Sequence, residues 1–279
     1  MSHRRIERPE TLIVADADQL MGFTTRRGFV RMLGLGGAVV MLPGVFAGCA
    51  MTPGAMTPAA GAMSDSGLMF DLRSDVGIFR LVHTLEQLEA AFYTAVVANP
   101  NFTSFFNAPE RELFTDLRNV EIVHREFLRA ALGSQAVPDV TGSINTGTLN
   151  AILASREGIL GAARLFEHLG VSGLNGAGKY LQDARNLLLA GKFVSVEARH
   201  AAALRDVAAP MGTMASTAFA GDDIVDGNGM DVKLEAGAVL DRAAATNIVT
   251  NGAISSRNIT YAPTPMQGVP SANFFPTTP

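Results

Sequence analysis

Two short motifs in this sequence pair a carboxylate with an imidazole three residues further on. Glu121 and His124 form one motif, and Glu197 and His200 form the other. On a helix, residues three apart lie about 60° apart and one turn along, so both side chains can reach one point. Carboxylate and imidazole ligands together suit iron, manganese or zinc. Two such pairs from two helices can therefore enclose two divalent metal ions.

Both motifs lie in apolar surroundings, which argues for burial. A buried charge without a partner costs several kcal/mol, so carboxylates there need a cation or one another. The apolar neighbours are Ile122, Val123 and Phe127 around one motif, and Val194, Val196, Ala201 and Leu204 around the other.

Single carboxylates on two further helices would complete a di-metal ligand set, in the arrangement of one Glu, then Glu-x-x-His, repeated in chain order. Glu86 is the candidate before the first motif, with Glu89 as an alternative ligand or as the partner of a cation on a neighbouring helix. Glu167 is the candidate before the second motif. Glu157 fits less well, because its separation from the motif does not match an antiparallel hairpin.

Three other residues on these segments could contribute. Tyr93 lies seven residues after Glu86, almost on the same face of a helix, and is otherwise an ordinary core tyrosine. His83 could be a further ligand, but a position at the surface or at a bundle end is favoured. His168 is expected to be exposed.

Apolar spacing predicts four long helices that would hold these residues, and no strand pattern competes with them. Gly133 and Gly170 fit just past the ends of the second and third helices, and Pro210 stops the fourth. The connection 134–147 can run the length of a bundle. We therefore expect an all-α four-helix bundle with a long connection between helices two and three. The predicted helices are 75–98, 109–132, 148–169 and 178–209.

Composition limits the other possibilities. Of 279 residues, 48% are hydrophobic, which is enough for one sizeable core. The net charge is −4 and no basic face stands out, so no nucleic-acid partner is expected. Residues 211–279 are predicted to be an irregular extension, with a short helix near 235–246.

The first 48 residues have the layout of an export signal. Arg26 and Arg27 precede a short apolar run and resemble a twin-arginine signal. Residues 46–49 resemble a lipobox, with Cys49 as the lipidated residue, although an ordinary signal peptidase could also cleave there. We expect residues 49–71 to form a flexible tether and residues 72–210 to form the bundle. We expect an exported protein, periplasmic or anchored in the membrane through lipid on Cys49.

Residues 84–93, Thr-Leu-Glu-Gln-Leu-Glu-Ala-Ala-Phe-Tyr, resemble the first helix of a bacterial ferritin-like domain family that is related to plant desiccation-responsive proteins. Segments 121–132, 165–173 and 196–205 resemble its other three helices. The likeness covers about half of the chain. It implies a ferritin-like fold and metal binding, often behind an export signal, without a settled reaction.

The resemblance also implies roles for single residues. Glu121 and Glu197 would bridge two metal ions, and Tyr93 matches a tyrosine beside such sites and is the candidate catalytic residue. Glu167 departs from the pattern, because it is predicted near the end of its helix. The positions that match the di-metal ligand pattern are Glu86, Glu121, His124, Glu167, Glu197 and His200.

The sequence thus favours a protein that binds two metal ions, iron first with manganese or zinc as alternatives. Its partners would be metal ions and a small oxidant, and its activity that of a di-iron oxidoreductase that oxidises ferrous iron or consumes peroxide. The alternative is a non-enzymatic envelope or desiccation-stress protein with structural metal or none.

Overall fold

The computed structural model describes residues 68–209, 221, 223–250 and 254–261, all within one compact unit. The twin-arginine segment, Cys49 and the tether as far as residue 67 lie outside the described residues. Among the described helices, none is both long and apolar enough to cross a membrane.

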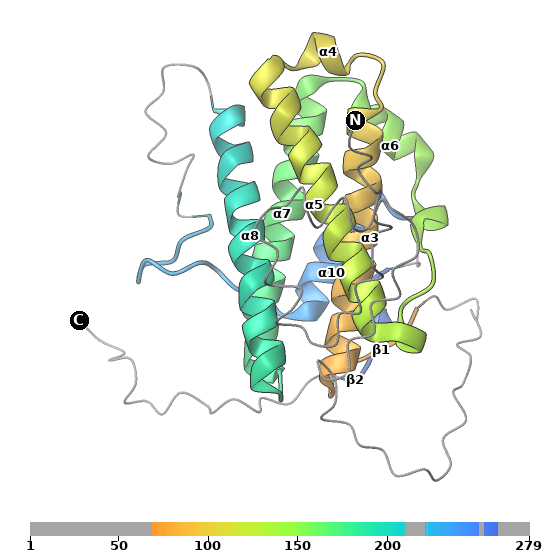
Figure 1. Ribbon diagram of the computed structural model, residues 1–279, viewed down its shortest axis with the longest axis vertical. Helices are drawn as coiled ribbons and strands as arrows, with labels where there is room; N and C mark the ends of the chain where they lie inside the picture. Colours follow the sequence, from red (N-terminus) through yellow and green to blue (C-terminus); the bar gives the residue numbers. More distant parts are fainter. Residues whose placement is uncertain (1–67, 210–220, 222, 251–253, 262–279) are drawn as a thin grey trace, which may run out of the picture. The chain divides into compact units, whose positions relative to one another are not determined.

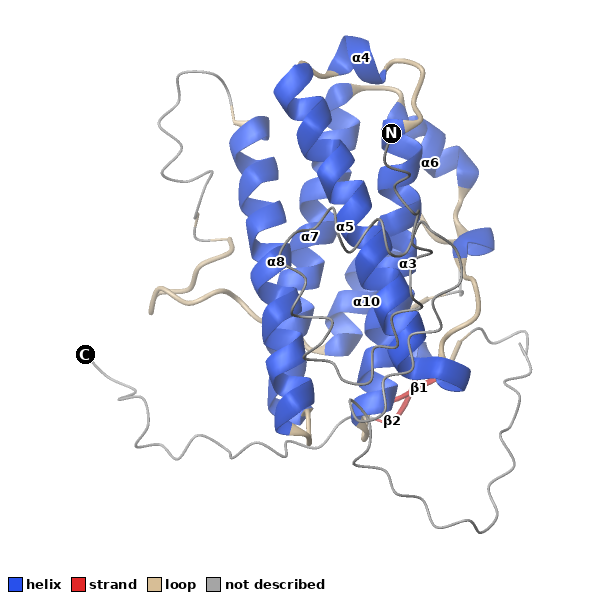
Figure 2. Cartoon of the chain, in the orientation of Figure 1, coloured by secondary structure: helices blue, strands red, loops and turns tan. Residues whose placement is uncertain are grey.

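Two helical hairpins form the body of the structure (Figure 1). Helix α3 (Asp75–Val97) packs along α5 (Ala108–Leu132), and α7 (Arg156–Ala177) packs along α8 (Ala184–Ala208). A short helix, α4 (Phe102–Phe105), lies between α3 and α5 in the chain. Helix dominates the described residues, as Figure 2 shows, and the predicted all-α bundle is confirmed.

Local signals set the ends of the first hairpin. The Ser74 side chain accepts a hydrogen bond from the amide of Gly77 at the start of α3. Asn107 and Glu110 form a reciprocal capping box at the start of α5. Gly133 follows the last residue of α5 with φ at 56°, a conformation that favours glycine. The predictions for these two helices are confirmed to within one residue.

The third predicted helix, 148–169, was wrong in two respects: it is interrupted, and it ends too early. The segment forms two helices, α6 (Thr146–Leu153) and α7, because Ser155 is extended and caps α7 by accepting from the amide of Gly158. At the other end, α7 continues through Gly170 to Ala177. Gly170 is therefore an internal residue of α7.

The fourth predicted helix began too early. Residues Gly178–Tyr180 form a short 3-10 turn, and α8 starts only at Ala184. Asp75, at the start of α3, accepts hydrogen bonds from the amides of Gln182 and Asp183 at 2.7 and 3.1 Å. Its carboxylate thus holds the linking segment in a non-helical conformation against the first hairpin.

The connection after α5 is bonded to α3. Gln87 accepts from the amide of Val140 at 3.0 Å, and the amide of Val137 donates to Nδ1 of His83 at 3.3 Å. His83 is 1% exposed, so the prediction of a surface or bundle-end position was wrong. Burial lowers the pKa of His83 to about 4, which keeps the ring neutral and able to accept this bond.

The C-terminal extension covers one side of the bundle. Helix α10 (Ala236–Ala245), close to the predicted short helix, packs against α7. The amide of Leu234 donates to the carbonyl of Ser172, and a Cβ at Gly176 would lie 1.8 Å from the Leu234 carbonyl oxygen. Only glycine at position 176 allows this approach.

A two-stranded parallel sheet that the sequence did not predict joins the two ends of the described unit. Strand β1 (Phe70–Asp71) pairs with β2 (Ile259–Tyr261). The amide of Leu72 extends the pairing by donating to the carbonyl of Tyr261 at 3.1 Å. Residues about 190 positions apart in the chain are thereby held together at one end of α3.

Candidate metal centre

The structure brings the six sequence-predicted ligand residues together inside the bundle. Each of the four long helices supplies part of the set. All six residues are buried, with at most 8% of their surface exposed. The contributors are Glu86 from α3, Glu121 and His124 from α5, Glu167 from α7, and Glu197 and His200 from α8.

One half of the centre surrounds His124. Its Nδ1 lies 3.3 Å from Oε2 of Glu86 and 3.2 Å from Oε2 of Glu121. The same nitrogen lies 3.0 Å from Oε1 of Glu197. Three carboxylates from three helices therefore converge on one imidazole nitrogen.

The other half repeats this arrangement around His200. Its Nδ1 lies 3.0 Å from Oε1 of Glu121 and 3.3 Å from Oε2 of Glu167. Oε2 of Glu197 is 3.8 Å away. In each half the candidate ligand atoms all lie within 4.8 Å of one another.

Glu121 and Glu197 belong to both halves and turn a different oxygen to each. Oε2 of Glu121 approaches His124 and its Oε1 approaches His200. Oε1 of Glu197 approaches His124 and its Oε2 approaches His200. A carboxylate with one oxygen on each side can bridge two cations. The two histidine rings lie on either side, with centroids 6.5 Å apart.

Several polar atoms of this cluster have no hydrogen-bond partner among the described residues, despite their close approach. Buried polar atoms in this state destabilise a fold, and buried anions need compensating charge. Two divalent ions would balance four carboxylates, and carboxylate with imidazole is a donor set that iron, manganese and zinc accept. The residues present therefore fit a di-metal centre. The unpartnered atoms are Oε2 of Glu86, Oε1 of Glu121, Oε2 of Glu167, both oxygens of Glu197 and Nδ1 of His200.

Without metal, the cluster shares protons among its members. Burial raises the pKa of Glu86 well above its ordinary value, and burial with the neighbouring Glu167 raises the pKa of Glu197 to about 7. Burial disfavours charge on His200, but the nearby carboxylates of Glu121 and Glu167 outweigh it and raise its pKa to about 10. The metal-free centre therefore holds protons that metal ions would displace.

Tyr93 lies beside the centre and is fully buried. Its hydroxyl donates to Oε1 of Glu167 at 2.6 Å, which leaves Oε2 of Glu167 turned toward His200. Burial, followed by the charge of Glu167, raises the pKa of Tyr93 well above its ordinary value. Tyr93 therefore stays protonated and orients one ligand through this hydrogen bond.

The structure separates the alternatives that the sequence left open on α7. Glu167 lies in the middle of α7, so the prediction that it sits near a helix end was wrong. Glu157 is exposed in the first turn of the same helix. His168 is half-buried, with Nε2 3.1 Å from Nη1 of Arg205, so the prediction of an exposed side chain was also wrong.

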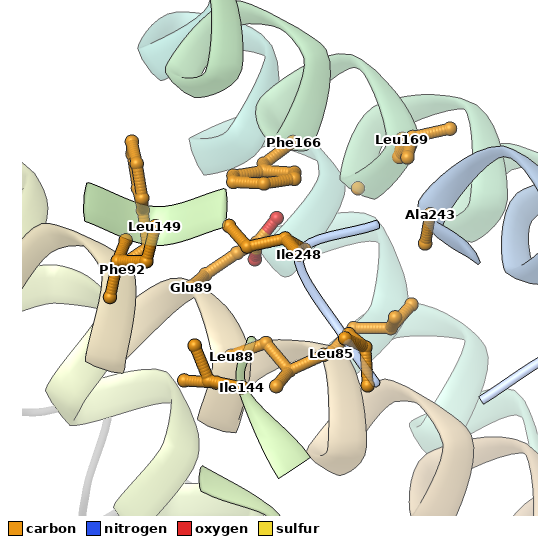
Figure 3. A pocket seen from close by; sticks show the side chains of 12 residues that line it. Leu85, Leu88, Glu89, Phe92, Ile144, Leu149, Phe166, Leu169, Ala243 and Ile248 are labelled. Carbon is orange, nitrogen blue, oxygen red and sulfur yellow. The ribbon is translucent and has the colours of Figure 1, made fainter. Parts of the chain in front are cut away.

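Glu89 is buried next to the cluster but belongs to neither ligand group. No ion pair joins it to a cation within the part of the chain that the structure describes. Burial, and then the charges of Glu197 and Glu86, raise its pKa well above the ordinary value. Its side chain points into an apolar pocket (Figure 3).

Two residues that support the centre were missed in the sequence. Phe193 packs on the His124 ring with centroids 4.4 Å apart, and it lies one turn before Glu197 on α8. Gly170 faces Glu197 from α7, where a Cβ would lie 3.4 Å from Oε2 of Glu197. The position of Phe193 one turn before a motif residue was a signal that could have identified it.

A comparison with protein-family models gives a match over the helical bundle. Residues 74–210 match a family described as the ferritin-like domain. Neither the curated proteins nor the solved structures gave a match. The matched range begins at the residue that caps α3 and covers all four long helices and all six candidate ligands.

Proposed function

Since residues 74–210 form a ferritin-like domain, we propose that this protein binds two metal ions and that the favoured metal is iron. Glu86 and His124 would hold one ion, and Glu167 and His200 the other, with Glu121 and Glu197 between them. Manganese and zinc suit the same donor set and are the alternatives.

The observation that carries this proposal is the pair of buried bridging carboxylates. Glu121 and Glu197 are at most 1% exposed and lie close together, and both oxygens of Glu197 lack a hydrogen-bond partner among the described residues. Two adjacent buried carboxylates repel each other, and a cation between them relieves both the repulsion and the unsatisfied oxygens.

We propose oxidation of ferrous iron as the reaction. Two ferrous ions supply two electrons, which with two protons reduce one dioxygen to hydrogen peroxide. The chain's own residues hold the ions in place, keep bulk water from the site through the apolar bundle, and fix the orientation of Glu167 through Tyr93.

Anaerobic titration of the full chain with ferrous iron tests the proposal. Two ions should bind per chain. Glu167→Ala should reduce this number to one, or lower the affinity for the second ion by about tenfold or more. Glu157→Ala, on the exposed first turn of the same helix, is the matched control and should bind two. A wild-type chain that binds no iron, manganese or zinc would contradict the proposal and leave the non-enzymatic envelope protein as the remaining candidate.

We further propose that the chain is exported by the twin-arginine route and anchored through lipid on Cys49. The support is the sequence layout of Arg26, Arg27 and the residues before Cys49. Replacing both arginines by lysine should leave the protein in the cytoplasm, and Cys49→Ser should release it from the membrane fraction. Unchanged fractionation of either variant would refute the corresponding step.

A further inference from the structure

Two small pockets meet on the side of the bundle that the C-terminal extension covers. They have volumes of about 30 and 50 Å³ and lie between α3 and α7. Residues Ala243, Ile248 and Val249 from the extension line the first pocket, and Ala236 and Val239 line the second. The residues that line both pockets are Leu85, Glu89, Leu169 and Gly170.

The first pocket is apolar apart from one group. Leu85, Leu88, Phe166 and Ile248 surround the carboxyl group of Glu89 in Figure 3. The Glu89 side chain is more than nine-tenths buried and has no hydrogen-bond partner among the described residues. A molecule in this space would therefore meet hydrocarbon on nearly every side.

The pockets reach the metal ligands. Glu86 lines the second pocket, and Gly170 lines both. Because a Cβ at position 170 would lie only 3.4 Å from Oε2 of Glu197, the missing side chain of Gly170 leaves space directly beside a bridging carboxylate.

We propose that these pockets admit dioxygen to the di-metal centre, and that Gly170 keeps their inner end open; this rests on the proposed function. Their volumes have room for a molecule of a few atoms, since about 10–15 Å³ on the same measure already holds one water. Hydrogen peroxide would lose most of its hydrogen bonds between such walls, whereas dioxygen has none to lose.

Xenon, an apolar probe that needs no metal, tests the pocket itself. In the metal-free full chain, amide signals of Leu85 and Gly170 should shift saturably with xenon pressure, and Ala243→Leu, which adds carbon to the first pocket, should weaken that response. Shifts that stay linear with xenon pressure, or that are the same in Ala243→Leu, would show that the first pocket does not bind an apolar molecule.

Gly170→Ala tests the passage. In the ferrous-loaded chain, oxidation by dioxygen should slow by about tenfold, in the range that one added carbon causes in a tight apolar pocket. Oxidation by hydrogen peroxide, measured in the same stopped-flow experiment, should change little. Gly161→Ala is the matched control, because it lies on the same helix with no atom within 4 Å of the added carbon.

The possible outcomes separate this inference from the proposed function. If oxidation by both oxidants is slowed equally in Gly170→Ala, the added methyl group displaces Glu197 and the proposed passage is refuted. Unchanged oxidation by both oxidants would also refute the passage. If the wild type binds no iron, the proposed function and the role for dioxygen fail together, while saturable xenon shifts would still establish an apolar binding site.

Discussion

The hydroxyl of Tyr93 on α3 donates a 2.6 Å hydrogen bond to Oε1 of Glu167 on α7. This bond joins the two helical hairpins at the depth of the candidate metal ligands. Because the other oxygen of Glu167 faces His200, the tyrosine determines how this carboxylate is presented to the second half of the centre.

Removing that hydroxyl should affect both stability and metal binding. Tyr93→Phe leaves Oε1 of Glu167 buried without a donor, which should lower the free energy of unfolding by about 1–3 kcal/mol. Loss of a group that orients a ligand should also lower the affinity for the second metal ion by about tenfold. Urea unfolding and ferrous titration of the full chain measure the two effects.

Tyr180→Phe is the control for that experiment. Tyr180 donates to Glu235 at the same distance, 2.6 Å, but at the surface. Its loss should change the unfolding free energy by less than about 1 kcal/mol and leave metal binding unchanged. Weakened metal binding in Tyr180→Phe, or none in Tyr93→Phe, would contradict the orienting role.

Stability of the metal-free protein should fall as pH rises above 6.5; below that value neutral His83, whose pKa is lowered to about 4, contributes in the opposite sense. The pKa of Glu197 is raised from 4.5 to about 7, so the folded state keeps a proton that the unfolded state releases, and this contribution is lost between those values. The pKa of His200 is raised from 6.5 to about 10, so its contribution is complete below 6.5 and lost toward 10. Urea unfolding with a chelator present, from pH 6.5 to 9, measures the trend.

Metal ions should reverse this trend. Deprotonated carboxylates bind cations better, so added metal should raise the unfolding free energy more at pH 8 than at pH 5. A metal-free protein that is equally stable at pH 6.5 and pH 9 would show that the cluster does not hold the protons assigned to it.

Neutralising Glu197, one of the two proposed bridging carboxylates, should have opposite effects with and without metal. At pH 8, Glu197→Gln should stabilise the metal-free chain by on the order of 1 kcal/mol, because it removes one of several adjacent buried charges. In the presence of metal the same variant should be less stable than the wild type. Glu112→Gln, at an exposed position of α5, should show neither effect. Destabilisation of the metal-free Glu197→Gln chain would contradict the prediction.

The contact between α7 and the C-terminal extension should depend on Gly176. A methyl group there would collide with the Leu234 carbonyl, so Gly176→Ala should cost about 1–3 kcal/mol of stability. The variant should also open α10 to limited proteolysis. Gly161→Ala, on the same helix with free space around it, should be neutral or stabilising. Equal protease resistance in the two variants would exclude the proposed collision.

The sequence predicted the bundle well because each long helix has a complete apolar face, and the two Glu-x-x-His motifs followed from spacing alone. It failed at Gly170, where a glycine that usually indicates a helix end instead lies inside α7 beside Glu197 of the neighbouring helix. Whether a glycine ends a helix or admits a neighbour depends on the packing of another helix, which spacing within one segment does not contain.

The burial of His83 could not be predicted for a related reason. It is buried by the connection after α5, whose path is fixed by hydrogen bonds to His83 and Gln87 across more than 50 residues of sequence. The pockets beside Glu89 likewise exist only because the C-terminal extension folds back over α3 and α7.

The pairing of β1 with β2 has a consequence for how the bundle is presented. Because Phe70 and Ile259 are partners, the segments before residue 68 and after residue 261 leave the described unit from neighbouring points. Helix α4 follows the opposite end of α3, about 34 Å away for a helix of 23 residues. Both ends of the described unit therefore lie at one end of the bundle, and the end that carries α4 has neither of them.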